Sequence, residues 1–171
     1  MRNLARVRRL PLLALVLVLV LAACGGSKRA GGNTIASGTK SPPPGDVIYQ
    51  GTSWAVAVSG TKALAYHFTG GRWLADHSGD PKLDILGPKP GQKVAATPQV
   101  AFQVRAKTDI VDTALWVDGV EVLGKGGGLT PKRGTIYGAP DKPLKPGPHL
   151  AVAYARDANH GNAVAWAFSA R

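Results

Sequence analysis

Large apolar residues recur at every second position along most of the chain after residue 46. The segments 54–58 and 64–68 alternate tryptophan, valine, leucine, tyrosine and phenylalanine with small or polar residues, and Ser-Gly-Thr separates them. A Thr-Gly-Gly turn then leads to 72–74. A period of two between turn signals is typical of β-hairpins. Residues 47–81 are therefore predicted to form a short β-meander with a single aromatic-rich face.

A second series of alternating segments follows. Leu83–Leu86 is predicted to be a short edge strand, because the prolines of Gly-Pro-Lys-Pro-Gly cannot continue a hydrogen-bond ladder. Segments 100–104 and 115–117 alternate, and the sequence Asp-Gly marks a tight turn after the second of them. The Gly-rich stretch 124–134 is expected to be a loop. A brief strand is expected at 135–137.

The strongest hairpin pattern lies near the C-terminus. Its strands alternate over 150–154 and 164–168, and Asp-Ala-Asn-His-Gly-Asn joins them. After the N-terminal apolar run, no segment shows the helical period that a crossover connection would need. The chain is therefore predicted to be all-β, with an antiparallel sandwich preceded by the meander.

The N-terminus has the pattern of an export signal. Four arginines precede residue 10 with no acidic residue among them, and an uninterrupted apolar run follows over 12–23. Crossing the hydrocarbon core of a bilayer takes roughly 20 apolar residues at 1.5 Å each, so this run is too short for a comfortable permanent span. Residues 1–23 are therefore predicted to be a signal peptide.

The only cysteine of the chain ends this apolar run. The sequence Leu21-Ala22-Ala23-Cys24 resembles the lipobox of bacterial lipoproteins. The resemblance implies cleavage before Cys24, a diacylglyceryl group on its sulfur and an N-acyl chain such as palmitate, with no other cofactor. Because each buried CH₂ contributes about 0.8 kcal/mol, several acyl chains together form a stable anchor. The implied location is the extracytoplasmic face of a cell membrane or outer membrane.

Residues 24–46 join this anchor to the strands. Glycine, serine, threonine and proline dominate the segment, and Ile35 is its only large aliphatic residue. Such a composition cannot bury enough apolar surface to order itself. It is therefore predicted to be a disordered tether with a span of roughly 25 Å. Since no cysteine follows Cys24, the body must be stable without disulfides.

The C-terminal half resembles the immunoglobulin-like domains of bacterial surface proteins. Shared features are the Asp-Gly hairpin of LWVDGVEV, the Pro-Gly-x-His sequence before the penultimate strand, an Asp…Gly-Asn turn and a terminal Trp-x-Phe. The resemblance implies an immunoglobulin-like β-sandwich over 82–171 that serves as an interaction module. The sequence lacks an inter-sheet cysteine pair, and 47–81 lies outside the pattern. Those hairpins could extend a sheet or form a flap.

The charge of the chain adds little to this interpretation. The formal net charge is +11, but after the signal peptide the basic residues are scattered without a cluster, and Lys28 and Arg29 lie near the anchor. Nucleic-acid binding would favour a basic stripe with interleaved aromatic residues. We therefore expect no nucleic-acid partner, and a monomer.

Two patterns suggest chemistry without completing it. His149, Asp157, Asn159 and His160 are ligand-type residues around the last hairpin. His149 and His160 lie at opposite ends of a strand, however, roughly 20–25 Å apart at 3.3 Å per residue. We therefore expect no metal site, and Asp157 and Asn159 to bond their own backbone.

A hydrolase is not indicated either. No serine lies in a Gly-x-Ser-x-Gly elbow, and His67 and His77 have no partner fixed by spacing. We therefore expect no enzymatic activity.

Aromatic residues are the remaining candidates for recognition. Trp73 beside Arg72, together with Tyr137, could form an exposed platform for a protein or a glycan. Trp116 is out of phase with its apolar neighbours, so one face of its strand should expose a large side chain. The sequence thus predicts an envelope binding module for a protein or a cell-wall glycan. The alternatives are a carrier of a metal or small solute and a purely structural spacer.

Overall fold

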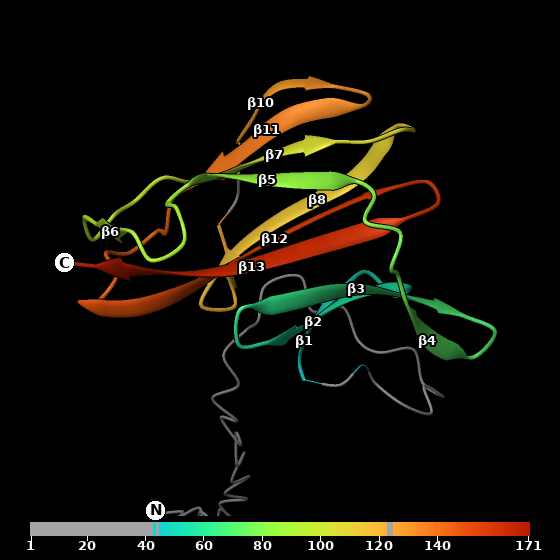
Figure 1. The fold of residues 1–171 in the computed structure, drawn as a ribbon, viewed down its shortest axis with the longest axis horizontal. Helices are drawn as coiled ribbons and strands as arrows, with labels where there is room; N and C mark the ends of the chain where they lie inside the picture. Colours follow the sequence, from blue (N-terminus) through green and yellow to red (C-terminus); the bar gives the residue numbers. More distant parts are fainter. Residues whose placement is uncertain (1–42, 44, 123–124) are drawn as a thin grey trace, which may run out of the picture.

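A computed structural model describes residues 43, 45–122 and 125–171, and it places 13 β-strands in them. Cys24, the signal peptide and all but the end of the predicted tether lie outside the described residues. No helix in the described part is long and apolar enough to cross a membrane. The strands form three sheets, and all pairs but one are antiparallel. The prediction of an all-β, antiparallel fold is confirmed (Figure 1).

The first four strands form a sheet of their own, which we call the meander sheet. Each strand pairs with the next along the chain. The strands are β1 (Asp46–Gln50), β2 (Trp54–Ser59), β3 (Lys62–Thr69) and β4 (Arg72–Ala75).

The remaining strands form a sandwich of two sheets. The outer sheet has the order β10, β11, β7, β5, which are Lys125–Thr130, Arg133–Gly138, Val100–Arg105 and Lys82–Gly87. The central sheet has the order β6, β13, β12, β8, β9, which are Lys93–Val94, Gly161–Ala170, Gly147–Asp157, Ile110–Val117 and Val120–Glu121.

The central sheet is covered on both faces. Leu115 and Val117 of β8 pack against the outer sheet, in a core that includes Phe102. Trp116 of the same strand packs in a second core with Val56 of the meander sheet. Figure 1 shows the resulting three layers, with the meander sheet below the central sheet and the outer sheet above it. The hairpins of 47–81 are therefore neither a sheet extension nor a flap but a third layer.

The meander does not have a single aromatic-rich face. Val56 lies opposite Ala65, and Val58 lies opposite Ala63, so the large residues of β2 and the alanines of β3 share the face toward the central sheet. Small side chains on β3 let that strand approach β13 closely. The large residues of β3 consequently lie on the opposite face of the meander sheet.

Two strands of the outer sheet, β10 and β5, bear on the sequence predictions for residues 124–134 and 83–86. The expected loop at 124–134 is wrong for most of its length, because β10 and β11 pair there as a hairpin with a register shift between Gly127 and Thr130. The Gly-rich sequence of β10 has no alternating pattern from which a strand could be predicted. Leu83–Leu86 is an edge strand as expected, since β5 ends the outer sheet.

One carboxylate ties the meander sheet to the central sheet. Asp76, directly after β4, accepts hydrogen bonds from the Gly161 N–H at 2.9 Å and from the Ser78 N–H at 2.9 Å, and its Oδ2 lies 3.3 Å from His160 Nδ1. Burial alone would raise the pKa of Asp76, but these hydrogen bonds and the nearby His160 lower it. The last hairpin is thus held against the end of the meander.

Trp54 packs between the meander sheet and the central sheet, near the contact of Asp76 with Gly161. Its ring lies 6.5 Å from that of Tyr154, and the Arg156 guanidinium lies 5.6 Å above it. A Cβ atom added to Gly161 would meet the Trp54 ring at 2.4 Å. Only glycine therefore allows β13 to pass under this indole.

Candidate binding pocket

The aromatic residues proposed as a platform do not meet. Trp116 is fully buried, at 0% exposure, so the prediction that it helps form an exposed surface is wrong. The reason is the third layer, since the face of β8 that carries Trp116 is covered by the meander sheet. Arg72 and Trp73 lie on β4 of the meander sheet, where Trp73 packs on Phe68 with ring centroids 5.2 Å apart. Tyr137 lies on β11 of the outer sheet, beyond the central sheet.

The ligand-type residues of the last hairpin stabilise its turn. Asp157 is buried, and its Oδ1 accepts the N–H groups of Asn159 and His160, each at 2.8 Å. Burial alone would raise the pKa of Asp157, but the nearby Thr108 hydroxyl and the hydrogen bonds from these amides lower it. Asp157 thus bonds its own backbone, as predicted. Asn159 takes part through its backbone N–H.

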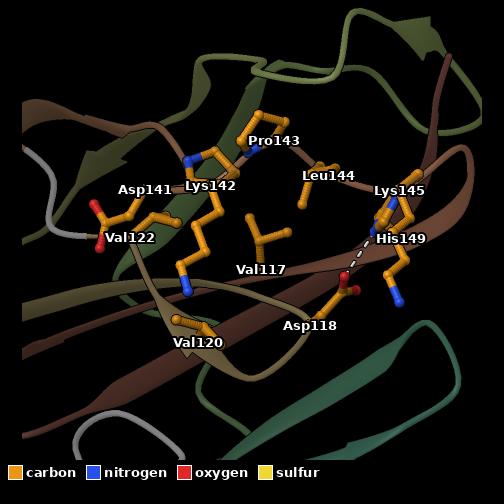
Figure 2. Close-up of a pocket in the computed structure, with 11 residues that line it drawn as sticks. Val117, Asp118, Val120, Val122, Asp141, Lys142, Pro143, Leu144, Lys145 and His149 are labelled. Atoms are coloured by element: carbon orange, nitrogen blue, oxygen red, sulfur yellow. Dashed lines mark hydrogen bonds and ion pairs between the residues drawn. The ribbon is translucent and has the colours of Figure 1, made fainter.

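A pocket of about 480 Å³ opens at the other end of β12. One wall is the β8–β9 hairpin, and the other is the segment 140–145, which leads toward β12 (Figure 2). Apolar side chains make up most of the lining, and the charged ones are Asp118, Asp141, Lys142, Lys145 and His149. A concave apolar site with a few polar groups has the size and character of small-ligand and side-chain pockets.

The hairpin wall takes its shape from a two-residue turn. Asp118 and Gly119 have φ values of 51° and 78°, and Val117 pairs with Val120 across them. Positive φ at both central positions is the geometry of a type I′ hairpin, which explains the Asp-Gly sequence. The turn brings the Asp118 carboxylate to β12, where its Oδ1 accepts the Leu150 N–H at 2.9 Å. The turn therefore fixes one polar group at the wall of the pocket.

His149 is held between two acceptors. Its Nδ1 lies 2.6 Å from Oδ2 of Asp118, and its Nε2 lies 2.7 Å from the carbonyl oxygen of Lys145. A carboxylate and a carbonyl can only accept hydrogen bonds, so both ring nitrogens must carry a proton for both bonds to form. The geometry therefore selects the imidazolium form of His149.

The electrostatics of His149 agree with this protonation state. Its side chain is only 9% exposed, and burial alone would lower its pKa. The hydrogen bond and the charge of Asp118, together with the Lys145 carbonyl, raise the pKa above its usual value. An imidazole with both nitrogens engaged has no free site for taking up a proton. The pair therefore fixes the wall of the pocket and is not arranged as a general base.

The two lysines of the pocket are exposed. Lys142 and Lys145 are exposed residues of the 140–145 wall. Figure 2 shows the Lys142 side chain reaching toward Val120 of the opposite wall. Val120 is 55% exposed at this rim. The rim thus offers apolar contact and positive charge side by side.

The pairing of His149 with Asp118 was missed from the sequence. The residues are 31 positions apart, but they become neighbours because Ala151 of β12 lies opposite Val117 of β8. The correct register of these two strands would have placed the turn carboxylate beside the start of β12. Among the described residues, no group of three or more histidines, cysteines, aspartates or glutamates could hold a metal ion.

Comparison with known proteins adds no relatives. No family model matches the chain, and no curated protein is similar to it. The inferences below therefore depend on the sequence and on the geometry of the described residues.

Proposed function

We propose that the chain is a lipid-anchored binding module of the bacterial cell envelope, without enzymatic activity. In this proposal the lipid is attached to Cys24, and residues 24–46 are the tether. The three-layer body carries an immunoglobulin-like sandwich over 82–171, and its pocket takes an apolar side chain of a partner protein. The lipobox resemblance supports the anchor, and the sandwich supports the immunoglobulin-like assignment.

The pocket beside the β8–β9 hairpin is the observation that carries the binding function. Its walls are apolar, its shape is fixed by the His149–Asp118 pair, and its rim exposes Val120. Apolar anchors that fill such pockets typically dominate the energy of protein interfaces. A protein is favoured over a glycan because the aromatic residues that would stack on a sugar lie in different sheets.

Val120→Asp tests this function. The full-length chain in mild detergent is used to capture proteins from envelope extract, and bound proteins are identified by mass spectrometry. Placing a carboxylate at the apolar rim should reduce capture of a specific partner by at least tenfold, because the charge would be desolvated on binding. Val111→Asp is the matched control, since Val111 is 51% exposed but does not line the pocket. Equal capture by the two variants would contradict the proposal.

A small-solute carrier is the second candidate. The pocket volume of about 480 Å³ is within the range of small-molecule sites. In that case native mass spectrometry of the purified chain should detect a bound small molecule that Val120→Asp releases and Val111→Asp retains.

A further inference from the structure

The outer edge of β13 is open along its middle. The backbone N–H and C=O groups of alternate residues in a strand point to opposite sides. In β13 the groups of odd-numbered residues point away from β12, because the Ala167 carbonyl accepts the Gly91 N–H at 2.8 Å and the Ser169 N–H donates to the Gln92 carbonyl at 2.9 Å. At the other end, the Gly161 N–H donates to Asp76. Between these points, the Ala165 N–H and C=O have no hydrogen-bond partner among the described residues. Because β6 pairs only with Ser169 and Ala170, it leaves this stretch uncovered.

This open edge forms the floor of a groove. Two hollows of about 680 and 440 Å³ adjoin there and share Thr61, Ile85 and Ala165 in their linings. The walls come from β3 of the meander sheet and from β5 and the loop after it, which lie on either side of β13 in Figure 1. Most of the lining is apolar, and Lys62 is the only charged residue in the two linings. We call this feature the edge groove.

Backbone groups at a strand edge require a particular kind of partner. Only an extended polypeptide presents N–H and C=O groups at the spacing of a β-ladder, and such strand addition is a known mode of peptide recognition. The Ala163 N–H donates to its neighbour Asn162 Oδ1 at 2.8 Å, and the Ala167 carbonyl accepts from Gly91, so the groups left for a partner run from the Ala163 C=O to the Ala167 N–H. This stretch is about 13 Å long at 3.3 Å per residue, enough for about five residues of a peptide. A second copy of this chain fits poorly, because its own β13 is equally recessed between β3 and β5.

We propose that the edge groove binds an extended segment of a partner polypeptide, which adds a strand to the central sheet beside Ala165. Side chains of alternate residues would contact the apolar walls, and an acidic residue at one end would pair with Lys62. This inference is independent of the pocket at the β8–β9 hairpin, since the two sites share no lining residue. A negative result for the edge groove would therefore leave the proposed function unaffected, and the reverse also holds.

The test uses a fluorescein-labelled peptide, Thr-Val-Ser-Val-Thr-Asp, and fluorescence anisotropy with the full-length chain in detergent. Two further peptides carry N-methyl groups on odd or on even positions. Strand addition uses the N–H groups of one alternate set, so one methylated peptide should bind at least tenfold more weakly and the other should bind like the parent. No binding of the parent peptide, or equal binding of all three, would overturn the proposal.

Substitutions in the groove test whether the peptide binds there. Ala165→Pro removes an outward N–H without touching the β12 ladder, Leu64→Arg narrows the groove from β3, and Lys62→Glu reverses its charge. Each should weaken binding at least tenfold while thermal unfolding shows a folded protein. Lys142→Glu, in the other pocket, is the matched charge control and should bind normally. If Ala165→Pro fails to fold, the Leu64 and Lys62 variants and the methylated peptides still test whether the peptide binds in the edge groove.

Two other occupants of the groove give different results. A dimer by light scattering that Leu64→Arg converts to a monomer would assign the groove to a second copy. Amide-exchange protection of Ala165 that disappears when residues 25–42 are deleted would assign it to the chain's own N-terminal segment. Either result would overturn the proposal of a partner polypeptide.

Discussion

His149 connects the pocket to pH. The charged ring donates to both Asp118 and the Lys145 carbonyl, whereas the neutral ring can donate to only one of them. Because the folded-state pKa is raised above the unfolded value of about 6.5, this stabilisation is present below about pH 6.5 and is lost as the pH rises through the folded pKa.

His149→Gln should therefore lower the melting temperature more at about pH 5.5 than at about pH 8.5, where less of the charged form is present in wild type. Thermal unfolding followed by circular dichroism at both values measures the difference. His77→Gln is the control, because His77 is exposed and a surface substitution should change the melting temperature little. A loss for His149→Gln that is the same at both pH values would contradict the imidazolium assignment.

Single residues were the hardest features to predict. Trp116 does lie on the face of β8 opposite to Leu115 and Val117, as predicted, but that face is buried and not exposed. A half-buried strand would expose Trp116, whereas β8 is buried on both faces. The continuous apolar run of residues 114–117 is typical of a strand buried on both faces, but it does not identify the element that covers the second face. That information is in β2 and β3, whose small residues suit close packing of two sheets.

The contact between Trp54 and Gly161 holds two elements together, β2 of the meander sheet and β13 of the central sheet. Gly161→Ala should destabilise the fold by roughly 1–3 kcal/mol, because the new methyl group would have to displace a packed indole. Urea unfolding followed by tryptophan fluorescence measures the change. Gly87→Ala is the matched control, since a Cβ there meets nothing within 4 Å, and it should change stability by less than about 0.5 kcal/mol. Equal effects of the two substitutions would show that the close approach of Trp54 is unimportant.

Elements with strong alternation were predicted well from sequence. Strands β2, β3, β7, β12 and β13 all lie where the period of two placed them. β10 was predicted to be a loop because glycine has low strand propensity, and its pairing with β11 is a tertiary effect. The pocket could not be predicted, because its walls come from a turn and a connecting segment that only the fold brings together.

At the scale of the whole molecule, the proposed lipid anchor should determine where the protein is located without affecting the stability of its body. Cys24→Ser should prevent acylation, so that the chain is either left uncleaved or released, while the body keeps its melting temperature. Metabolic labelling with a palmitate analogue and Triton X-114 phase partitioning test the anchor. Wild type should take up label and enter the detergent phase, and signal-cleaved Cys24→Ser should do neither. Signal-cleaved Cys24→Ser protein that still partitions with membranes would contradict the lipoprotein assignment.

The central sheet, covered on both faces, has a consequence for how the chain reaches its native state. Its strands β12 and β13 are apolar without interruption over residues 150–155 and 163–168, the composition that favours self-association when a strand is exposed. The meander strands pair with sequence neighbours, whereas the long partner of β8 is β12, which follows β9, β10 and β11 along the chain. The meander can therefore form early and shield one face of the late-forming sheet. Besides its place in the layers, we expect the meander to limit aggregation of the central sheet during folding.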